Sequence, residues 1–241
     1  MRSDIIGVTG WIKNSFIDFP GTVSTVLFFS GCNLRCPYCH NPSIVCDESL
    51  AHVSSEEIWN FLIKRRNVLD GVVLSGGEPT LYDHMAETAR SIRSLGYAVK
   101  LDTNGLLPDR IKEIGPDFLS LDIKTIPQNY TPLLKAGHID IAERLQSSIA
   151  IARAMGSNAE IRITIAPEII NKEIIEELSL LLANIGKVWL QPMQTKAPMI
   201  DPAMSHKTAV PLKEILLYRD MLLRTVKSCE IRGYNPKQQL E

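Results

Sequence analysis

The sequence lacks the features that mark membrane, secreted and nucleic-acid-binding proteins. No run of about 18 consecutive apolar residues is present, and residues 1–13 contain no apolar core of a secretion signal. The net charge is only −1, so no whole-protein field attracts nucleic acid or an anionic membrane. The five cysteines are an odd number, which argues against a disulfide framework and for a reducing compartment. We therefore expect a cytoplasmic protein with no membrane partner and no nucleic-acid partner.

Low-complexity tracts, charge blocks and long linkers are also missing. With 241 residues, 45% of them hydrophobic and 22% charged, the chain is long enough to bury one large core. We expect residues 1–241 to form a single domain, with residues 1–21 as an N-terminal extension.

Three of the five cysteines stand close together. Cys32, Cys36 and Cys39 have the spacing C-x3-C-x2-C and follow the apolar run of residues 23–29. Thiolates are soft ligands that suit zinc, copper(I) and iron–sulfur clusters. Three ligands leave one coordination position open, as in a catalytic centre, whereas a structural zinc site closes with a fourth protein ligand, for which His40 and Cys46 are the nearby candidates. Residues 29–46 are therefore predicted to be a metal-binding loop, with a structural zinc site as the alternative.

Apolar strand-like runs alternate with helical patterns along the rest of the chain. The expected strands cover residues 23–29, 71–75, 97–101, 118–123, 161–165 and 188–190. The first helix follows a capping box at residues 54–57, and the last runs from Pro211 through Val226. Strands that alternate with helices predict a parallel sheet of right-handed crossovers, either an open doubly wound sheet or an incomplete barrel.

Polar residues at the strand ends favour the barrel. In a barrel the chemistry collects at the carboxyl ends of several strands, and here nearly every strand ends in polar residues. They are Cys32, residues 75–78, residues 102–105, Asp122 with Lys124, Thr164, and Gln191 with Gln194. We predict an α/β fold, an incomplete (βα)6 TIM-like barrel of parallel strands, with its site on one rim.

Each of these polar stretches also has a simpler interpretation. Residues 76–79 can be a plain turn from strand to helix, and residues 102–105 a turn rich in Asp, Asn and Gly. Asp122 and Lys124 can be an exposed ion pair of little energetic value. Strand alternation, however, places both on one side of the strand, with Leu121 and Ile123 on the other. Inside a barrel rim such charges are costly unless a partner or a ligand satisfies them.

The cysteine spacing, with Tyr38 just before the last cysteine, resembles the signature of the radical S-adenosylmethionine (radical SAM) superfamily. The resemblance implies a [4Fe-4S] cluster held by the three cysteines, with S-adenosylmethionine on the fourth iron. It also implies reductive cleavage of that cofactor to methionine and a 5′-deoxyadenosyl radical. Residues 76–78 resemble the GGE motif, which binds the amino group of the cofactor.

Two further stretches resemble motifs of the glycyl radical enzyme activases, a branch of that superfamily. Residues 102–105 are similar to their DTNG motif, which implies that Asp102 belongs to a monovalent cation and cofactor-carboxylate site. Residues 121–124 are similar to their LDxK motif, which implies contacts with the ribose and methionyl ends of the cofactor. The implied cofactor-binding residues are Tyr38, Gly76, Gly77, Glu78, Asp102, Thr103, Asn104, Asp122, Lys124, Thr164 and Gln194.

Residues 10–21 and 39–42 are most similar to the activating proteins of anaerobic ribonucleoside-triphosphate reductase. The pyruvate formate-lyase activases instead have a DGPG turn where this chain has residues 18–21, and a histidine where it has Gln194. The resemblance implies a glycyl radical enzyme as partner, of the anaerobic ribonucleotide reductase type, and a flavodoxin or ferredoxin-type electron donor. The residues expected to dock the partner are Phe16, Asp18, Phe19 and Arg162.

Alternatives remain for these docking residues and for the function. Phe16, Ile17 and Phe19 can instead plug the end of the barrel, because exposed apolar patches are uncommon on monomers. Arg162 can be an ordinary surface arginine. The rival functions are a radical SAM enzyme acting on a small molecule, such as a deazapurine precursor, and a noncatalytic zinc-binding adaptor. Cys229 is expected to be a packed apolar residue.

Overall fold

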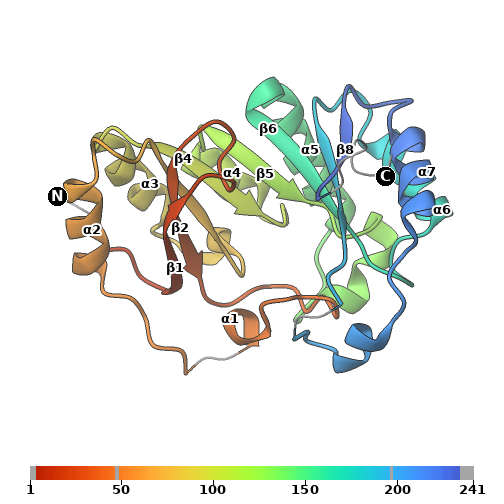
Figure 1. The fold of residues 1–241 in the computed structure, drawn as a ribbon, viewed down its shortest axis with the longest axis horizontal. Helices are drawn as coiled ribbons and strands as arrows, with labels where there is room; N and C mark the ends of the chain where they lie inside the picture. The colour runs from red at the N-terminus through yellow and green to blue at the C-terminus, as the bar shows by residue number, and fades with distance from the viewer. Residues whose placement is uncertain (1–3, 47–48, 196–197, 234–241) are drawn as a thin grey trace, which may run out of the picture.

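The computed structural model describes residues 4–46, 49–195 and 198–233, and Figure 1 shows their arrangement. One sheet of eight strands runs in the order of the sequence. The strands are β1 (Val8–Ser15), β2 (Ser24–Phe29), β3 (Gly71–Gly76), β4 (Ala98–Thr103), β5 (Phe118–Asp122), β6 (Ala159–Ile165), β7 (Val188–Pro192) and β8 (Cys229–Ile231). The helices are α1 (Pro42–Cys46), α2 (Ser55–Lys64), α3 (Met85–Ser94), α4 (Pro108–Ile114), α5 (Ile141–Met155), α6 (Lys172–Leu181) and α7 (Leu212–Leu222).

The sheet is an open, partial barrel. Strands β2 to β8 run parallel to one another, and helices connect them. Within the described residues β1 and β8 pair with one neighbour each, so they form the two edges of the sheet. In Figure 1 the red β1 and the blue β8 lie far apart. The predicted single α/β domain with an incomplete TIM-like barrel is confirmed.

The number of strands differs from the prediction. The six expected strands are present as β2 to β7, and β1 and β8 are additional. β1 pairs antiparallel with β2 and carries Lys13 and Asn14 on its exposed part, so it has no continuous apolar run. β8 has only three residues. The last helix ends at Leu222 rather than Val226, which leaves room for this strand.

Local sequence explains where the helices begin. Ser54 accepts a hydrogen bond from the backbone N–H of Glu57 (3.5 Å), as the capping box predicts, and α2 buries Ile58 and Leu62 against the sheet. Asn171 accepts from the N–H of Ile174 (2.9 Å) at the start of α6. Because the helices cover the outer face of the sheet, the inner face is left to line a site.

The connection between β1 and β2, residues 16–23, lies at the amino-terminal ends of the parallel strands. Ser15 pairs with Ser24, and Ser24 pairs with Gly71, the first residue of β3. The cysteine loop leaves β2 at the opposite end, after Phe29. The turn therefore lies at the end of the barrel opposite the cysteine loop, which does not fit the expected docking of a partner beside that loop.

Phe19 closes that far end of the barrel. Its side chain is 5% exposed and packs with Val26 and Val73. A Cβ added to Gly71 would lie 2.8 Å from Phe19 Cδ1, so the ring occupies the space above that glycine. The docking role expected of Phe19 is corrected to the plug that was its alternative. The same turn carries Phe16 and Asp18. The side chain of Phe16 is 76% exposed, and the carboxylate of Asp18 accepts a hydrogen bond from the Ser15 hydroxyl.

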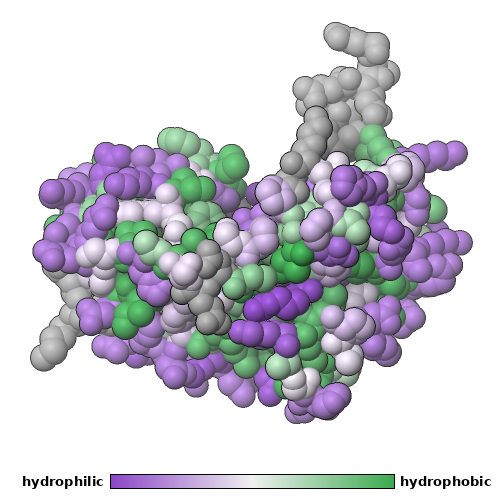
Figure 2. Space-filling model, turned by 90° about the horizontal axis from the view of Figure 1, so that it is seen from below, coloured by the Kyte–Doolittle hydropathy of each residue, from purple (hydrophilic) through white to green (hydrophobic). Residues whose placement is uncertain are grey.

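No helix within the described residues is long and apolar enough to cross a membrane. Figure 2 shows the face seen from below in Figure 1; its hydrophobic residues form small groups separated by hydrophilic ones.

Candidate functional site

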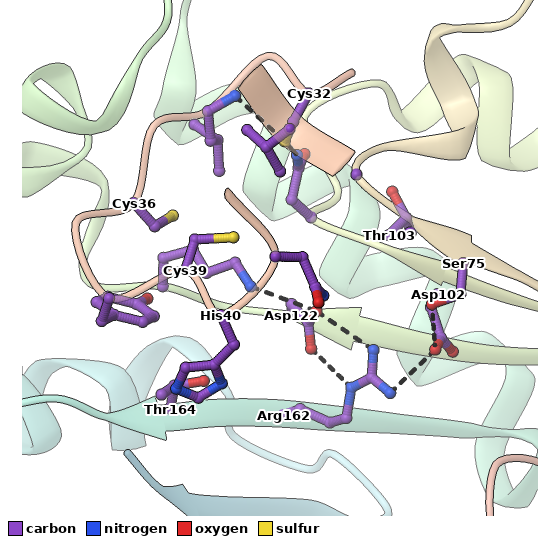
Figure 3. A pocket seen from close by; sticks show the side chains of 18 of the residues that line it. Cys32, Cys36, Cys39, His40, Ser75, Asp102, Thr103, Asp122, Arg162 and Thr164 are labelled. Atoms are coloured by element: carbon purple, nitrogen blue, oxygen red, sulfur yellow. Dashed lines mark hydrogen bonds and ion pairs between the residues drawn. The ribbon is translucent and has the colours of Figure 1, made fainter. Parts of the chain in front are cut away.

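One cavity of about 280 Å³ lies at the carboxyl ends of the strands, between the cysteine loop and β3 to β7 (Figure 3). Most of the residues predicted from the sequence line it. They are Cys32, Cys36, Tyr38, Cys39, Gly76, Gly77, Asp102, Thr103, Asn104, Asp122, Lys124, Arg162 and Thr164. Five strands and one loop, far apart in the sequence, thus converge on a single rim.

The cysteine loop is held in shape by its own backbone. Gly31 has φ +76°, a left-handed conformation that favours glycine, and redirects the chain after β2. The guanidinium of Arg35 donates hydrogen bonds to the carbonyl oxygens of Cys32 (2.9 Å) and Leu34 (2.8 Å). The N–H of Cys39 donates to the carbonyl of Cys36 (3.0 Å), which makes a tight turn between these two ligands. Their sulfurs face the same space in Figure 3.

Burial makes the thiols of Cys32 and Cys36 poor thiolates on their own. Desolvation, and secondarily the charge of Glu78, raise the pKa of Cys32 to about 12. Desolvation also raises the pKa of Cys36, and the ammonium of Lys124 opposes this effect only in part. A positively charged metal centre is therefore needed to hold them as thiolates.

The donor set fits a cluster better than a single ion. A tetrahedral zinc site needs its sulfurs about 4 Å apart, given Zn–S bonds of about 2.3 Å. Within the described residues, no three His, Cys, Asp or Glu side chains converge closely enough to hold one ion. In a [4Fe-4S] cluster each cysteine binds a different iron, so three cysteines that line one cavity need not meet at a single point. Cys46 is exposed and lies outside the cavity lining, and Cys229 is buried in the core as predicted.

Five charged side chains form a chain of ion pairs along the inner face. Arg162 donates to Asp122 through Nε (2.7 Å) and Nη2 (3.2 Å), and to Asp102 through Nη1 (3.2 Å). Lys124 Nζ lies 3.3 Å from Asp122 Oδ2, and Lys100 pairs with Asp102. Figure 3 shows Arg162 between the two carboxylates. The interpretation of Asp122 and Lys124 as an exposed pair is wrong, because their side chains are 26% and 17% exposed and face the cavity.

This chain of ion pairs keeps both carboxylates ionised. Burial alone would raise the pKa of Asp122, but Arg162 and Lys124 outweigh it and hold that pKa well below its ordinary value. Burial likewise opposes Arg162 and Lys100 at Asp102, and the pKa of Asp102 is lowered. The pKa of Lys124 is raised in spite of its burial, chiefly by Asp122.

Two residues predicted for the cofactor site lie elsewhere. Glu78 is fully buried and does not line the cavity. Its carboxylate accepts from the backbone N–H of Thr80 (3.1 Å) and of Asn104 (2.7 Å), and from the hydroxyls of Thr80 (2.6 Å) and Thr103 (2.8 Å). It therefore ties the end of β3 to the end of β4. Gln194 is exposed, and Gln191 lines the cavity in its place, because only Gln191 lies within β7.

Arg162 is the largest change in role. The sequence predicted partner docking or an ordinary surface position, yet its side chain is 11% exposed and both neighbouring carboxylates bind it. Lys100 and Asn33 were missed. The Asn104 amide donates to Asn33 Oδ1 (2.7 Å), beside Cys32, so the 102–105 turn supports the cysteine loop. Lys100 stands two residues before Asp102, and the alternation that paired Asp122 with Lys124 is the signal that predicts its position.

A sequence profile described as the Radical SAM superfamily matches residues 26–181, from β2 to the end of α6. The chain belongs to the radical SAM superfamily. The three cavity-lining cysteines lie inside the matched region. Family membership implies a [4Fe-4S] cluster and S-adenosylmethionine, and identifies the protein as a radical SAM enzyme.

The sequence is similar to proteins of three named activities. This radical SAM enzyme is 32% identical over 199 residues to a Methanocaldococcus jannaschii protein named as a glycyl-radical enzyme activating enzyme, across 78% of this chain and 80% of that one. It is 30% identical to the pyruvate formate-lyase-activating enzyme of Clostridium pasteurianum, across 74% and 78% of the two chains. A shorter match of 91 residues, 37% identical, covers 37% of this chain and 38% of the 7-carboxy-7-deazaguanine synthase of Hyperthermus butylicus.

Solved structures agree on the fold. The crystal structure of QueE from Escherichia coli superposes with a TM-score of 0.55 at 15% identity, across 94% of this chain and 93% of that one. At this level of identity the likeness shows that the two chains share the partial barrel, and nothing about what they act on.

Proposed function

We propose that this radical SAM enzyme is an activase that installs a glycyl radical in a partner enzyme. The observation that carries the proposal is the convergence of the cysteine loop with Asp102, Asp122 and Lys124 on one cavity, in the order that the activase motifs follow along the chain. The two relatives that match about three quarters of the chain, both named as activating enzymes, support it.

The residues of the chain would bind and orient the cofactors. Cys32, Cys36 and Cys39 would hold the cluster, while the charged side chains facing them would hold S-adenosylmethionine. Three cations against two carboxylates leave one positive charge in surplus along Lys100, Asp102, Arg162, Asp122 and Lys124, which suits the methionyl carboxylate. The remaining cofactor contacts would come from Tyr38, Gly76, Gly77, Thr103, Asn104 and Thr164.

Two glycines would let the backbone approach the cofactor closely. Gly76 has φ +116°, and a Cβ on Gly77 would lie 1.9 Å from the carbonyl oxygen of Gly31. Only glycine therefore lets the end of β3 pack against the start of the cysteine loop. Glu78 would affect cofactor binding indirectly. Its hydrogen bonds to the Thr103 hydroxyl and the Asn104 N–H fix the turn that faces the cavity.

The cofactors carry the hard chemistry in this proposal. When bound, the cluster and S-adenosylmethionine would supply a 5′-deoxyadenosyl radical by one-electron reductive cleavage, and this radical would take a hydrogen atom from a backbone glycine of the partner. The protein would exclude water from the cavity and hold the glycine loop of the partner within a few ångströms of the radical. We infer that the partner is of the anaerobic ribonucleoside-triphosphate reductase type and that a flavodoxin or ferredoxin-type protein donates the electron.

The resemblance also implies a monovalent cation near Asp102, and the side chains there do not suit one. Lys100 pairs with one oxygen of the Asp102 carboxylate, and Arg162 with the other. No step is derived through such an ion.

The test is glycyl radical formation. The reconstituted, reduced protein is incubated anaerobically with S-adenosylmethionine and an anaerobic ribonucleoside-triphosphate reductase encoded in the same genome, and the radical is measured by electron paramagnetic resonance. We expect a glycine-centred doublet with the native protein and none with Cys36→Ala. The partial match to a deazaguanine synthase makes a small-molecule substrate the second candidate. Turnover of a deazapurine precursor, with no radical on the reductase, would favour it and contradict the activase proposal.

A further inference from the structure

One lysine lies inside the barrel, beneath the candidate site. Lys100 is 1% exposed and occupies the middle of β4, between Val99 and Leu101, which point to the helices. Its ammonium pairs with Asp102, two residues further along the same strand. Since Asp102 lines the cofactor cavity and Lys100 does not, the ammonium lies one layer beneath the cavity floor.

Burying an ammonium group is costly unless a counter-charge stays beside it. Within the described residues, Asp102 is the carboxylate that forms an ion pair with Lys100. The buried carboxylate of Glu160 instead accepts hydrogen bonds from the Ser120 hydroxyl (2.7 Å) and the Trp189 indole N–H (2.9 Å), and that of Glu78 accepts from Thr80, Thr103 and Asn104. The Lys100–Asp102 pair is therefore specific, and it lies directly under the ligand site.

The carboxylate of Asp102 has its donors on both oxygens. Asp102 Oδ1 forms the ion pair with Lys100. Asp102 Oδ2 accepts hydrogen bonds from the Ser75 hydroxyl (3.1 Å) and from Arg162 (3.2 Å), both of which are drawn in Figure 3. An alkali metal ion at this carboxylate would displace one of these donors and lie beside two fixed positive charges. The position of such an ion is already filled by the protein.

We propose that the Lys100 ammonium is a built-in replacement for the monovalent cation at Asp102, so that S-adenosylmethionine binding needs no alkali metal ion. The inference rests on the proposed function, because it concerns how that cofactor is held. Lys100 is a positioning residue: it fixes the carboxylate of Asp102, which faces the cofactor, and touches no cofactor atom itself. A covalently attached cation cannot diffuse away, so the site keeps its charge in any salt.

The native protein gives the first test. S-adenosylmethionine is titrated calorimetrically into cluster-loaded protein in potassium, sodium or tetramethylammonium chloride at one ionic strength. We expect dissociation constants that agree within about twofold. A loss of tenfold or more in tetramethylammonium would overturn the inference and leave the proposed function standing. No binding in any salt, with the cluster intact, would overturn both.

A variant gives the second test. Lys100→Met keeps an unbranched side chain, one atom shorter, and removes the charge, which opens the position beside Asp102 to a mobile cation. We expect its cofactor affinity to be at least tenfold weaker in tetramethylammonium and to recover in potassium, while the melting temperature of its cluster-free form rises with potassium. Lys64→Met, at an exposed lysine of α2, is the control and should show neither effect.

Salt-independent, native affinity in Lys100→Met would show that the residue is only structural and would contradict the inference. If Lys100→Met does not fold, the salt series on the native protein still decides.

Discussion

The guanidinium of Arg162 donates two hydrogen bonds to the carboxylate of Asp122, from Nε (2.7 Å) and Nη2 (3.2 Å). The two residues are direct partners in the ladder between β5 and β6, so the sheet itself sets their spacing. The same guanidinium reaches Asp102 on β4. One cation thus holds two acids that would otherwise repel each other, and both remain ionised at the edge of the ligand cavity.

Acid should weaken this arrangement. The folded-state pKa of Asp122 is lowered from its ordinary value of 3.8, so its ion pair stabilises the folded protein fully above that value, and this stabilisation is lost progressively as the pH falls from 3.8 towards the lower folded-state pKa. We expect the difference in unfolding free energy between native protein and Asp122→Asn to narrow by about 1 kcal/mol between pH 7 and pH 3. Urea unfolding of the cluster-free proteins measures it. A difference that stays constant over this range would contradict the assignment.

Lys124 should matter for the cofactor and not for the cluster. Its ammonium pairs with Asp122 and faces the cavity, so Lys124→Met leaves a buried carboxylate partly unbalanced and removes a charge that the cofactor would meet. We expect S-adenosylmethionine binding to weaken by about 2 to 5 kcal/mol, with iron and sulfide content unchanged. Lys112→Met, on the exposed face of α4, is the matched control. Unchanged affinity in Lys124→Met would remove the residue from the cofactor site.

Glu78 should act as a structural acceptor. In Glu78→Gln the new NH2 group faces donors, because four N–H and O–H groups point at the carboxylate. We expect the cluster-free protein to lose about 1 to 3 kcal/mol of stability, whereas Glu87→Gln, on the exposed side of α3, should lose almost none. Urea unfolding curves of the cluster-free variants measure both losses of stability. A variant of native stability that binds S-adenosylmethionine poorly would restore the direct contact implied by the GGE resemblance.

Phe19 should behave as a core residue. The ring is buried at the far end of the barrel, against Val26, Val73 and Phe118, so Phe19→Ala leaves a cavity there. We expect a loss of about 3 to 5 kcal/mol in unfolding free energy, and a change of less than about 0.5 kcal/mol for Phe16→Ala on the exposed turn. If Phe19→Ala has normal stability but fails to activate a partner, the assignment of Phe19 as a core residue is contradicted.

Residues whose position depends on strand alternation could be predicted from the sequence. Asp122 and Lys124 lie on the cavity side because they are two apart on a strand, and the cysteine loop lies at the rim because it directly follows β2. Lys100 obeys the same rule with Asp102. It was missed because a lysine inside a barrel is costly, and only the structure shows the carboxylate that offsets this cost.

Positions that depend on tertiary pairing could not be predicted. The place of Phe19 follows from the antiparallel pairing of β1 with β2, and β1 has no apolar run that identifies it as a strand. Arg162 was expected to dock the partner or to lie on the surface, because its inward role depends on two acids from other strands. Gln191 and Gln194 both follow the sixth predicted strand, and only the true end of β7 separates them.

The most direct test of the central claim is the 5′-deoxyadenosine that the protein forms from S-adenosylmethionine after anaerobic reconstitution with iron and sulfide and reduction by dithionite. We expect about four irons and four acid-labile sulfides per chain, and 5′-deoxyadenosine and methionine in equal amounts. Cys32→Ala, Cys36→Ala and Cys39→Ala should each abolish both the cluster and the product, whereas Cys46→Ala should retain both. Bound zinc without acid-labile sulfide, and no 5′-deoxyadenosine from the native protein, would contradict the account.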